Sequence, residues 1–143
     1  QALRDKPVQY LSHGQKKRVA IAGALVMQAD YLLLDEPTAG LDPTGRRQMI
    51  VLLDRILAQG KRVVISSHDI DLIYEVCDYL YVLERGELVA QGSAQQVLLD
   101  QAVLDRAGLV QPWLVKLHTE LGLPLYPNEA ALFAAQGRKL EAV

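Results

Sequence analysis

The sequence is short of cysteine, of excess charge of either sign and of long apolar runs, and each shortage excludes a class of protein. The single cysteine, Cys77, cannot support an internal disulfide framework and fits a reducing compartment. With 15 Lys and Arg against 17 Asp and Glu, the formal net charge of −2 argues against a nucleic-acid partner, because nucleic-acid binders neutralise many phosphates. The most apolar run, residues 19–34, is interrupted by Gln28 and Asp30 and is too short to cross a bilayer as one helix.

The chain nevertheless contains enough apolar material for a folded core. Of its 143 residues, 50% are hydrophobic, which is the size and composition of one ordinary globular domain. The run "YLLLDEP" is typical of a strand of a parallel sheet that is buried on both faces. A helix is predicted to follow this strand. Asp42 is its plausible N-cap, Pro43 suits its first position, and Gly60 ends it. A second buried strand over 62–66 completes a βαβ unit.

The remaining pattern divides the chain near Gly92. Before that point we expect a helix from Asp69 to Val76 and strands over 79–83 and 88–91, joined by the turn "ERGE". After it, proline-punctuated helical stretches over 94–99, 113–121 and 128–136 predict a small helical appendage. The predicted domains are therefore a core over 1–92 and a helical extension over 93–143.

The stretch "YLSHGQKKRVAIAGALV" poses a question about charge. Ser12 followed by Gln15 is a capping-box pattern, which predicts a helix from His13 to about Gln28. The first turn of a helix carries roughly half a positive charge, so the three basic residues at 16–18 destabilise it unless something compensates. A solvated helix face explains a basic run on its own, whereas an anionic ligand explains it in the context of a binding site.

Two adjacent carboxylates, Asp35 and Glu36, end the first predicted strand. In open α/β sheets, ligands lie beyond the carboxyl ends of the strands. Adjacent strand residues point to opposite sides, so the two groups are expected to differ in role. Asp35 is a candidate ligand of hydrated Mg²⁺, and Glu36 is a candidate proton acceptor for an attacking water. An exposed strand end is the alternative for such a pair taken alone.

Four motifs in order narrow these alternatives. The segments "LSHGQ" at 11–15, "YLLLDEP" at 31–37, "AGLDP" at 39–43 and "SSHD" at 66–69 resemble the signature, Walker B, D-loop and switch-histidine motifs of ATP-binding cassette (ABC) ATPases. The resemblance runs from about Leu3 to Gly92. It implies an α/β fold, the incomplete core of a P-loop NTPase of the ABC type, with a mostly parallel sheet and a C-terminal helical extension.

The resemblance also implies roles for the residues near the strand ends. Asp35 resembles the Walker B aspartate associated with Mg²⁺, and Glu36 resembles the catalytic glutamate that polarises the attacking water. His68 resembles the switch histidine that senses the γ-phosphate of ATP. Asp42 resembles the D-loop aspartate that links two nucleotide sites, although it is equally a good N-cap.

The signature motif implies a partner subunit. In this family two cassettes dimerise head to tail, and the signature turn of one contacts the ATP held by the other. Ser12, His13, Gly14 and Gln15 would form this anion site, with the helix N–H groups as donors. His13 departs from the family's commonest pattern, which has glycine there, but it resembles a variant found in cobalt and related energy-coupling ATPases.

The phosphate-binding loop of this family is missing. No G-x-x-x-x-G-K-[ST] pattern occurs in the sequence, so it supplies neither the lysine for the β- and γ-phosphates nor the hydroxyl for Mg²⁺. We therefore expect the chain to be the C-terminal part of a longer polypeptide and to be inactive alone. ATP and Mg²⁺ would both require the missing N-terminal half.

The expected function is that of an ATP-hydrolysing subunit of an ABC importer for cobalt, another metal or a vitamin. Its expected partners are a second ATPase subunit and a transmembrane subunit, at the cytoplasmic face of the inner membrane. Two alternatives remain at this stage. One is a soluble ABC ATPase of DNA repair or translation, and the other is a non-catalytic fragment that dimerises or regulates.

Overall fold

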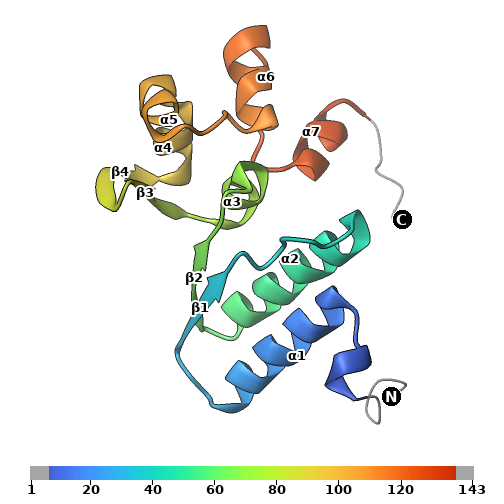
Figure 1. Ribbon diagram of the computed structural model, residues 1–143. Coiled ribbons are helices and arrows are strands. Elements are labelled where there is room, and N and C mark those ends of the chain that lie inside the picture. The colour runs from blue at the N-terminus through green and yellow to red at the C-terminus, as the bar shows by residue number, and fades with distance from the viewer. Residues whose placement is uncertain (1–6, 138–143) are drawn as a thin grey trace. The chain divides into compact units, whose positions relative to one another are not determined.

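The computed structural model describes residues 7–137, which divide into two compact units between Ser67 and His68. The predicted domains 1–92 and 93–143 extend into residues 1–6 and 138–143, which lie outside the described residues. Figure 1 labels the α-helices and strands of both units.

The first unit is a βαβ arrangement preceded by a helix (Figure 1). Its strands are parallel, with Leu32 beside Val63 and Asp35 beside Ser66, which confirms the predicted strand, helix, strand unit. In chain order its elements are η1 (Val8–Tyr10), α1 (His13–Val26), β1 (Tyr31–Asp35), α2 (Pro43–Ala58) and β2 (Arg62–Ser66).

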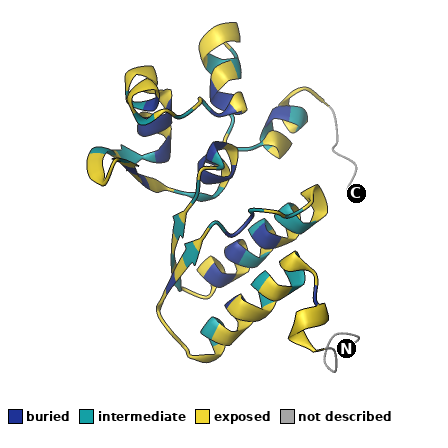
Figure 2. Ribbon diagram, viewed as in Figure 1, coloured by how far each residue is buried: buried dark blue, intermediate teal, exposed yellow. Residues whose placement is uncertain are grey.

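Both helices of the first unit pack on the same face of its sheet. The core joins Ile21 of α1 and Leu32 of β1 to one stripe of α2, made of Met49, Leu53 and Ile56. Alternate strand side chains point to the other face, and Figure 2 colours residues in both strands as exposed. There Tyr31 is 56% exposed, Leu33 78% and Val64 56%. The prediction that these strands are buried on both faces is therefore wrong here, because both helices cover one face.

The second unit combines a β-hairpin with short helices. The hairpin is antiparallel, and its turn has Arg85 and Gly86 at φ 50° and 85°, as a two-residue turn with left-handed central residues requires. The helix over residues 94–99 contacts both strands and the helices over residues 70–76, 101–107 and 113–121. The elements are α3 (Ile70–Val76), β3 (Tyr79–Glu84), β4 (Glu87–Ser93), α4 (Ala94–Leu99), α5 (Gln101–Ala107), α6 (Trp113–Leu121) and α7 (Glu129–Ala135).

The boundary between the units falls at Ser67 because the C-terminal helices pack on α3. The Trp113 backbone N–H donates to Asp71 Oδ1 at 2.9 Å, and the Tyr74 hydroxyl donates to the Tyr126 carbonyl at 2.8 Å. The strands form two separate sheets, β1 with β2 in parallel and β3 with β4 in antiparallel. The division at residue 92 stays a prediction. No helix among residues 7–137 has the length and apolar character to span a membrane.

Candidate functional site

The amino end of α1 is closed by the predicted capping box. The Ser12 hydroxyl accepts from the Gln15 backbone N–H at 3.3 Å, and Gln15 Oε1 accepts from the Ser12 N–H at 3.0 Å. These bonds use two of the N–H groups that a helix leaves unpaired at its start. The N–H groups of His13 and Gly14 are then the ones that remain for an acceptor outside the helix.

The amino end of α2 is capped by Asp42, also as predicted. Asp42 Oδ1 accepts from the Gly45 N–H at 2.8 Å, and Pro43 occupies the first turn. Gly45 suits this arrangement because a Cβ there would lie 2.7 Å from Asp42 Oδ1. The loop before the cap turns at Gly40, whose φ of 72° is in the region that favours glycine.

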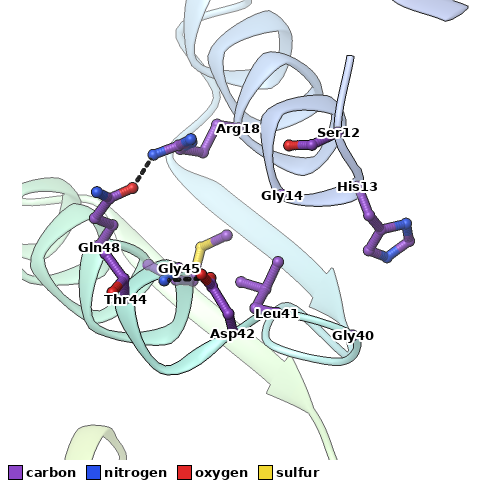
Figure 3. A pocket seen from close by; sticks show the side chains of 11 residues that line it. Ser12, His13, Gly14, Arg18, Gly40, Leu41, Asp42, Thr44, Gly45 and Gln48 are labelled. Atoms are coloured by element: carbon purple, nitrogen blue, oxygen red, sulfur yellow. Dashed lines mark hydrogen bonds between the residues drawn. The ribbon is translucent and has the colours of Figure 1, made fainter. Parts of the chain in front are cut away.

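A pocket of about 430 Å³ lies between these two helix starts (Figure 3). The structure thus brings the signature-like and D-loop-like segments, which are separate in sequence, to one site. Its lining comprises Ser12, His13, Gly14 and Arg18 from the first segment and helix, and Gly40, Leu41, Asp42, Thr44, Gly45, Gln48 and Met49 from the second.

The two segments of the pocket pack closely through their glycines. A Cβ at Gly40 would lie 3.4 Å from the imidazole Cδ2 of His13, so the ring of His13 lies next to the bare backbone of Gly40. A Cβ at Gly14 would lie 3.0 Å from Leu41 Cδ2. His13 occupies the position where the family usually has glycine, and its imidazole is accommodated next to Gly40.

The basic run of α1 finds acceptors within the first unit. Lys17 Nζ donates to the backbone carbonyls of Glu36 and of Ala39, the latter at 2.9 Å. Arg18 donates to the Gln48 side-chain oxygen across the pocket, as Figure 3 shows. The side chain of Lys16 is exposed. Oxygens of the protein itself thus compensate two of the three cations. An anionic ligand is therefore not needed to explain the charges of Lys17 and Arg18.

The two adjacent carboxylates contact different hydroxyl groups. The Ser66 hydroxyl donates to Asp35 Oδ1, and the Ser67 hydroxyl donates to Glu36 Oε2 at 3.0 Å. The Glu36 backbone is left-handed, with φ 44°, and its N–H donates to the Ser66 carbonyl at 2.8 Å. Asp35 is exposed and Glu36 is half-buried. Their separate environments agree with the expectation of separate roles, and the roles themselves stay predictions.

The second predicted catalytic residue, His68, is the first residue of the second unit. It is exposed, and Asp69 beside it caps α3 by accepting from the Leu72 N–H at 3.0 Å. The structure therefore places Asp35 and Glu36 together in one unit and His68 at the start of the other.

Asp35, the candidate metal ligand, is not part of a cluster of metal-binding side chains among the described residues. Among the described residues, no group of three or more His, Cys, Asp or Glu side chains could hold a metal ion. Mg²⁺ is commonly held by one or two carboxylates together with substrate phosphates and water. A single exposed Asp35 fits that mode of binding.

Sequence reasoning missed part of the pocket and its support. Gln48 and Thr44 lie one turn apart on α2 and line the pocket, and Lys17 links α1 to the turn after β1. The available signal was the basic run itself, since a lysine and an arginine at a helix start need acceptors.

Comparison with known proteins gives consistent matches. The ABC transporter family profile matches residues 1–39. The cobalt import ATP-binding protein CbiO of Salmonella typhimurium is 62% identical over 133 residues, 93% of this chain and 49% of that protein. The energy-coupling factor transporter ATP-binding protein EcfA of Carboxydothermus hydrogenoformans is 44% identical over 132 residues, 90% of this chain and 48% of that protein.

A solved structure extends the likeness to the fold. The structure of cbiO1 from Clostridium perfringens, described as part of the ABC transporter complex cbiONQ, superposes with a TM-score of 0.64. It is 42% identical and covers 83% of this chain and 48% of that one. The predicted fold class is confirmed by this likeness. The chain spans about half the length of the curated relatives it matches.

Proposed function

Since the chain is homologous over nearly all of its length to ATP-binding proteins of ABC transporters, we propose that it forms part of the ATP-hydrolysing subunit of an ABC importer. The observation that carries the proposal is the pocket in which Ser12, His13 and Gly14 meet Gly40 and Asp42. The signature-like segment and the D-loop-like segment, which in this family lie between two nucleotide sites, both line this one pocket.

The chemistry of the pocket suits a phosphate. The N–H groups of His13 and Gly14 and the hydroxyl of Ser12 are hydrogen-bond donors at the positive end of α1. The Ser12 oxygen accepts from the Gln15 N–H, so the hydroxyl hydrogen can be donated outward. In a head-to-tail dimer this set of donors, together with Gln15, would meet the γ-phosphate of ATP held by the partner, and Asp42 would link the two nucleotide sites.

The carboxylates would serve the nucleotide of their own subunit. Glu36 would accept a proton from the attacking water, and His68 would contact the γ-phosphate. Asp35 would hold Mg²⁺, which neutralises charge on the phosphates. The Ser67 hydroxyl, at 3.0 Å from Glu36 Oε2, would orient the carboxylate of Glu36.

The names of the relatives support a substrate class and a place in the cell. Cobalt import and energy-coupling factor proteins favour uptake of cobalt, a related metal or a vitamin over the alternatives of DNA repair and translation. The subunit would act at the cytoplasmic face of the inner membrane. Its partners would be a second ATPase subunit and a transmembrane subunit.

The test measures transport and ATP turnover together. The ATPase carrying this sequence, expressed with its own membrane subunits in cells without a cobalt importer, should restore cobalt uptake. Glu36→Gln should abolish uptake and ATP hydrolysis and leave ATP binding intact, because the amide keeps the shape and loses the base. A matched control is Glu87→Gln on the exposed hairpin turn, which should change neither.

Two outcomes would contradict parts of the proposal. Ordinary hydrolysis by Glu36→Gln would remove this residue from its catalytic role. Hydrolysis without cobalt uptake in the unsubstituted protein would overturn the cobalt assignment and leave the ATPase assignment standing.

A further inference from the structure

Lys17 connects α1 to the turn that follows β1. Its ammonium donates to the carbonyl oxygen of Glu36 and, at 2.9 Å, to that of Ala39. The Ala39 N–H also donates to the Glu36 carbonyl at 3.3 Å, so one carbonyl receives both the turn's own bond and the cation. Hydrogen bonds from a charged donor are about twice as strong as neutral ones. The turn is therefore held from outside by a residue 19 positions earlier in the chain.

The residue that Lys17 holds has an unfavourable backbone conformation. Glu36 has a φ of 44°, and a left-handed conformation is unfavourable for a residue with a Cβ. Such a conformation persists only where the surroundings enforce it. Here the N–H of Glu36 donates to the Ser66 carbonyl at 2.8 Å, and its carbonyl accepts from Lys17. The peptide groups on both sides of the Cα are thus fixed.

We infer that Lys17 is a positioning residue for Glu36. Its ammonium, by binding the Glu36 and Ala39 carbonyls, keeps the Glu36 backbone left-handed and thereby sets the direction of the carboxylate. The inference rests on the proposed function, in which Glu36 is the proton acceptor. Removal of the ammonium then leaves the nucleotide contacts unchanged and misdirects the carboxylate, so kcat falls and KM for ATP does not.

The chain offers a matched control for this contact. Lys61 Nζ donates to the Ala29 carbonyl at 2.7 Å, which is the same kind of bond in the same unit, between the segments that lead into β2 and β1. The carboxylates lie at the other ends of these strands. Lys61→Met therefore removes a similar stabilising contact and leaves the surroundings of Glu36 intact.

The test compares these variants in the ATP-hydrolysing protein that carries this sequence. Lys17→Met should lower kcat by about tenfold or more and keep KM for ATP within about twofold, whereas Lys61→Met should change neither. Lys17→Gln is measured in parallel, with the same expectation, in case methionine prevents folding. In a Cys77→Ser background, Lys17→Cys treated with 2-bromoethylamine regains an ammonium at nearly the original reach and should recover most of the lost kcat.

Several results would overturn the inference. These are a kcat of Lys17→Met and Lys17→Gln within about twofold of the unsubstituted protein, an equal loss in Lys61→Met, or no recovery after aminoethylation. Glu36→Gln is run beside them. Hydrolysis that survives Glu36→Gln would contradict the proposed function, whereas hydrolysis abolished by Glu36→Gln but insensitive to Lys17 would contradict this inference alone.

Discussion

Residue 36 combines an unfavourable backbone conformation with the carboxylate to which we assign the role of proton acceptor. The left-handed φ of Glu36 is supported on one side by the Ser66 carbonyl and on the other by Lys17. Non-glycine residues in such conformations cluster at functional sites, where the surrounding structure enforces them. The conformation thus gives Glu36 a physical distinction that the neighbouring Asp35 lacks.

Cys77 should be a poorly reactive thiol. Burial, and after it the neighbouring charge of Asp78, together raise its pKa to about 11. Since the thiolate is the reactive form, alkylation by iodoacetamide should be slow at neutral pH and should rise about tenfold per pH unit toward pH 11. Asp78→Asn should shift the profile to lower pH, because it removes a negative charge that disfavours the thiolate. A rate that levels off near pH 8.5 would contradict this expectation.

Residues whose partners are close in sequence could be predicted, and residues with distant partners could not. Ser12 with Gln15 and Asp42 with Pro43 are local patterns, and the structure confirms both caps. Arg18 bonds to a residue 30 positions away, and Lys17 to carbonyls 19 and 22 positions away. Those pairings depend on how α1 packs beside α2 and β1, which no short motif specifies.

At the scale of elements, the hydrophobic pattern predicted where most helices and strands lie but not which faces of the strands are covered. The positions of the strand over 62–66 and of the helices over 94–99 and 113–121 are confirmed. Helix α5 was missed because it is one short stretch between Asp100, its N-cap, and Gly108, whose left-handed φ ends it. An apolar strand run cannot indicate how many faces of the sheet are covered, which is why the exposure of Leu33 was not foreseen.

The cap of α2 should contribute measurably to stability. Asp42→Ala removes the acceptor for the Gly45 N–H and should lower the free energy of unfolding by about 1 kcal/mol, whereas Asp42→Asn should cost less because its amide oxygen still accepts. Urea denaturation followed by circular dichroism measures the difference. The control is Asp54→Ala on the exposed face within α2, which should cost little or nothing. Equal losses at the two positions would contradict a capping role.

At the scale of the molecule, both sheets leave apolar side chains in solvent. Tyr31, Leu33 and Val64 are exposed in the first unit, and Tyr81 and Leu83 in the second, where they are 66% and 65% exposed. Two-stranded sheets are marginally stable alone, and their open edges invite further pairing.

A polypeptide of these 143 residues alone should therefore associate in solution and should bind no ATP. The association follows from the exposed apolar faces and unpaired strand edges, and the lack of affinity follows from the absence of a G-x-x-x-x-G-K-[ST] loop. Sedimentation velocity measures the first, and titration with a fluorescent ATP analogue measures the second. A monomer that hydrolyses ATP would contradict both expectations.

The central claim is that the pocket of one subunit acts on the nucleotide of another, and mixing two inactive variants tests it most directly. Ser12→Arg places a large cation at the pocket of its own subunit, and Glu36→Gln removes the base of its own subunit. In a head-to-tail dimer of one of each, both defects fall on the same nucleotide site, and the other site is intact.

The measurement is the ATPase rate of the two purified variants, each in the ATP-hydrolysing protein that carries this sequence, alone and after mixing in equal amounts before ATP is added. Each variant alone should be inactive. The mixture should regain about a quarter of the unsubstituted rate, because half of randomly formed dimers are mixed and each has one working site of two. A mixture that stays inactive, although the two variants exchange subunits, would contradict action on the partner's nucleotide.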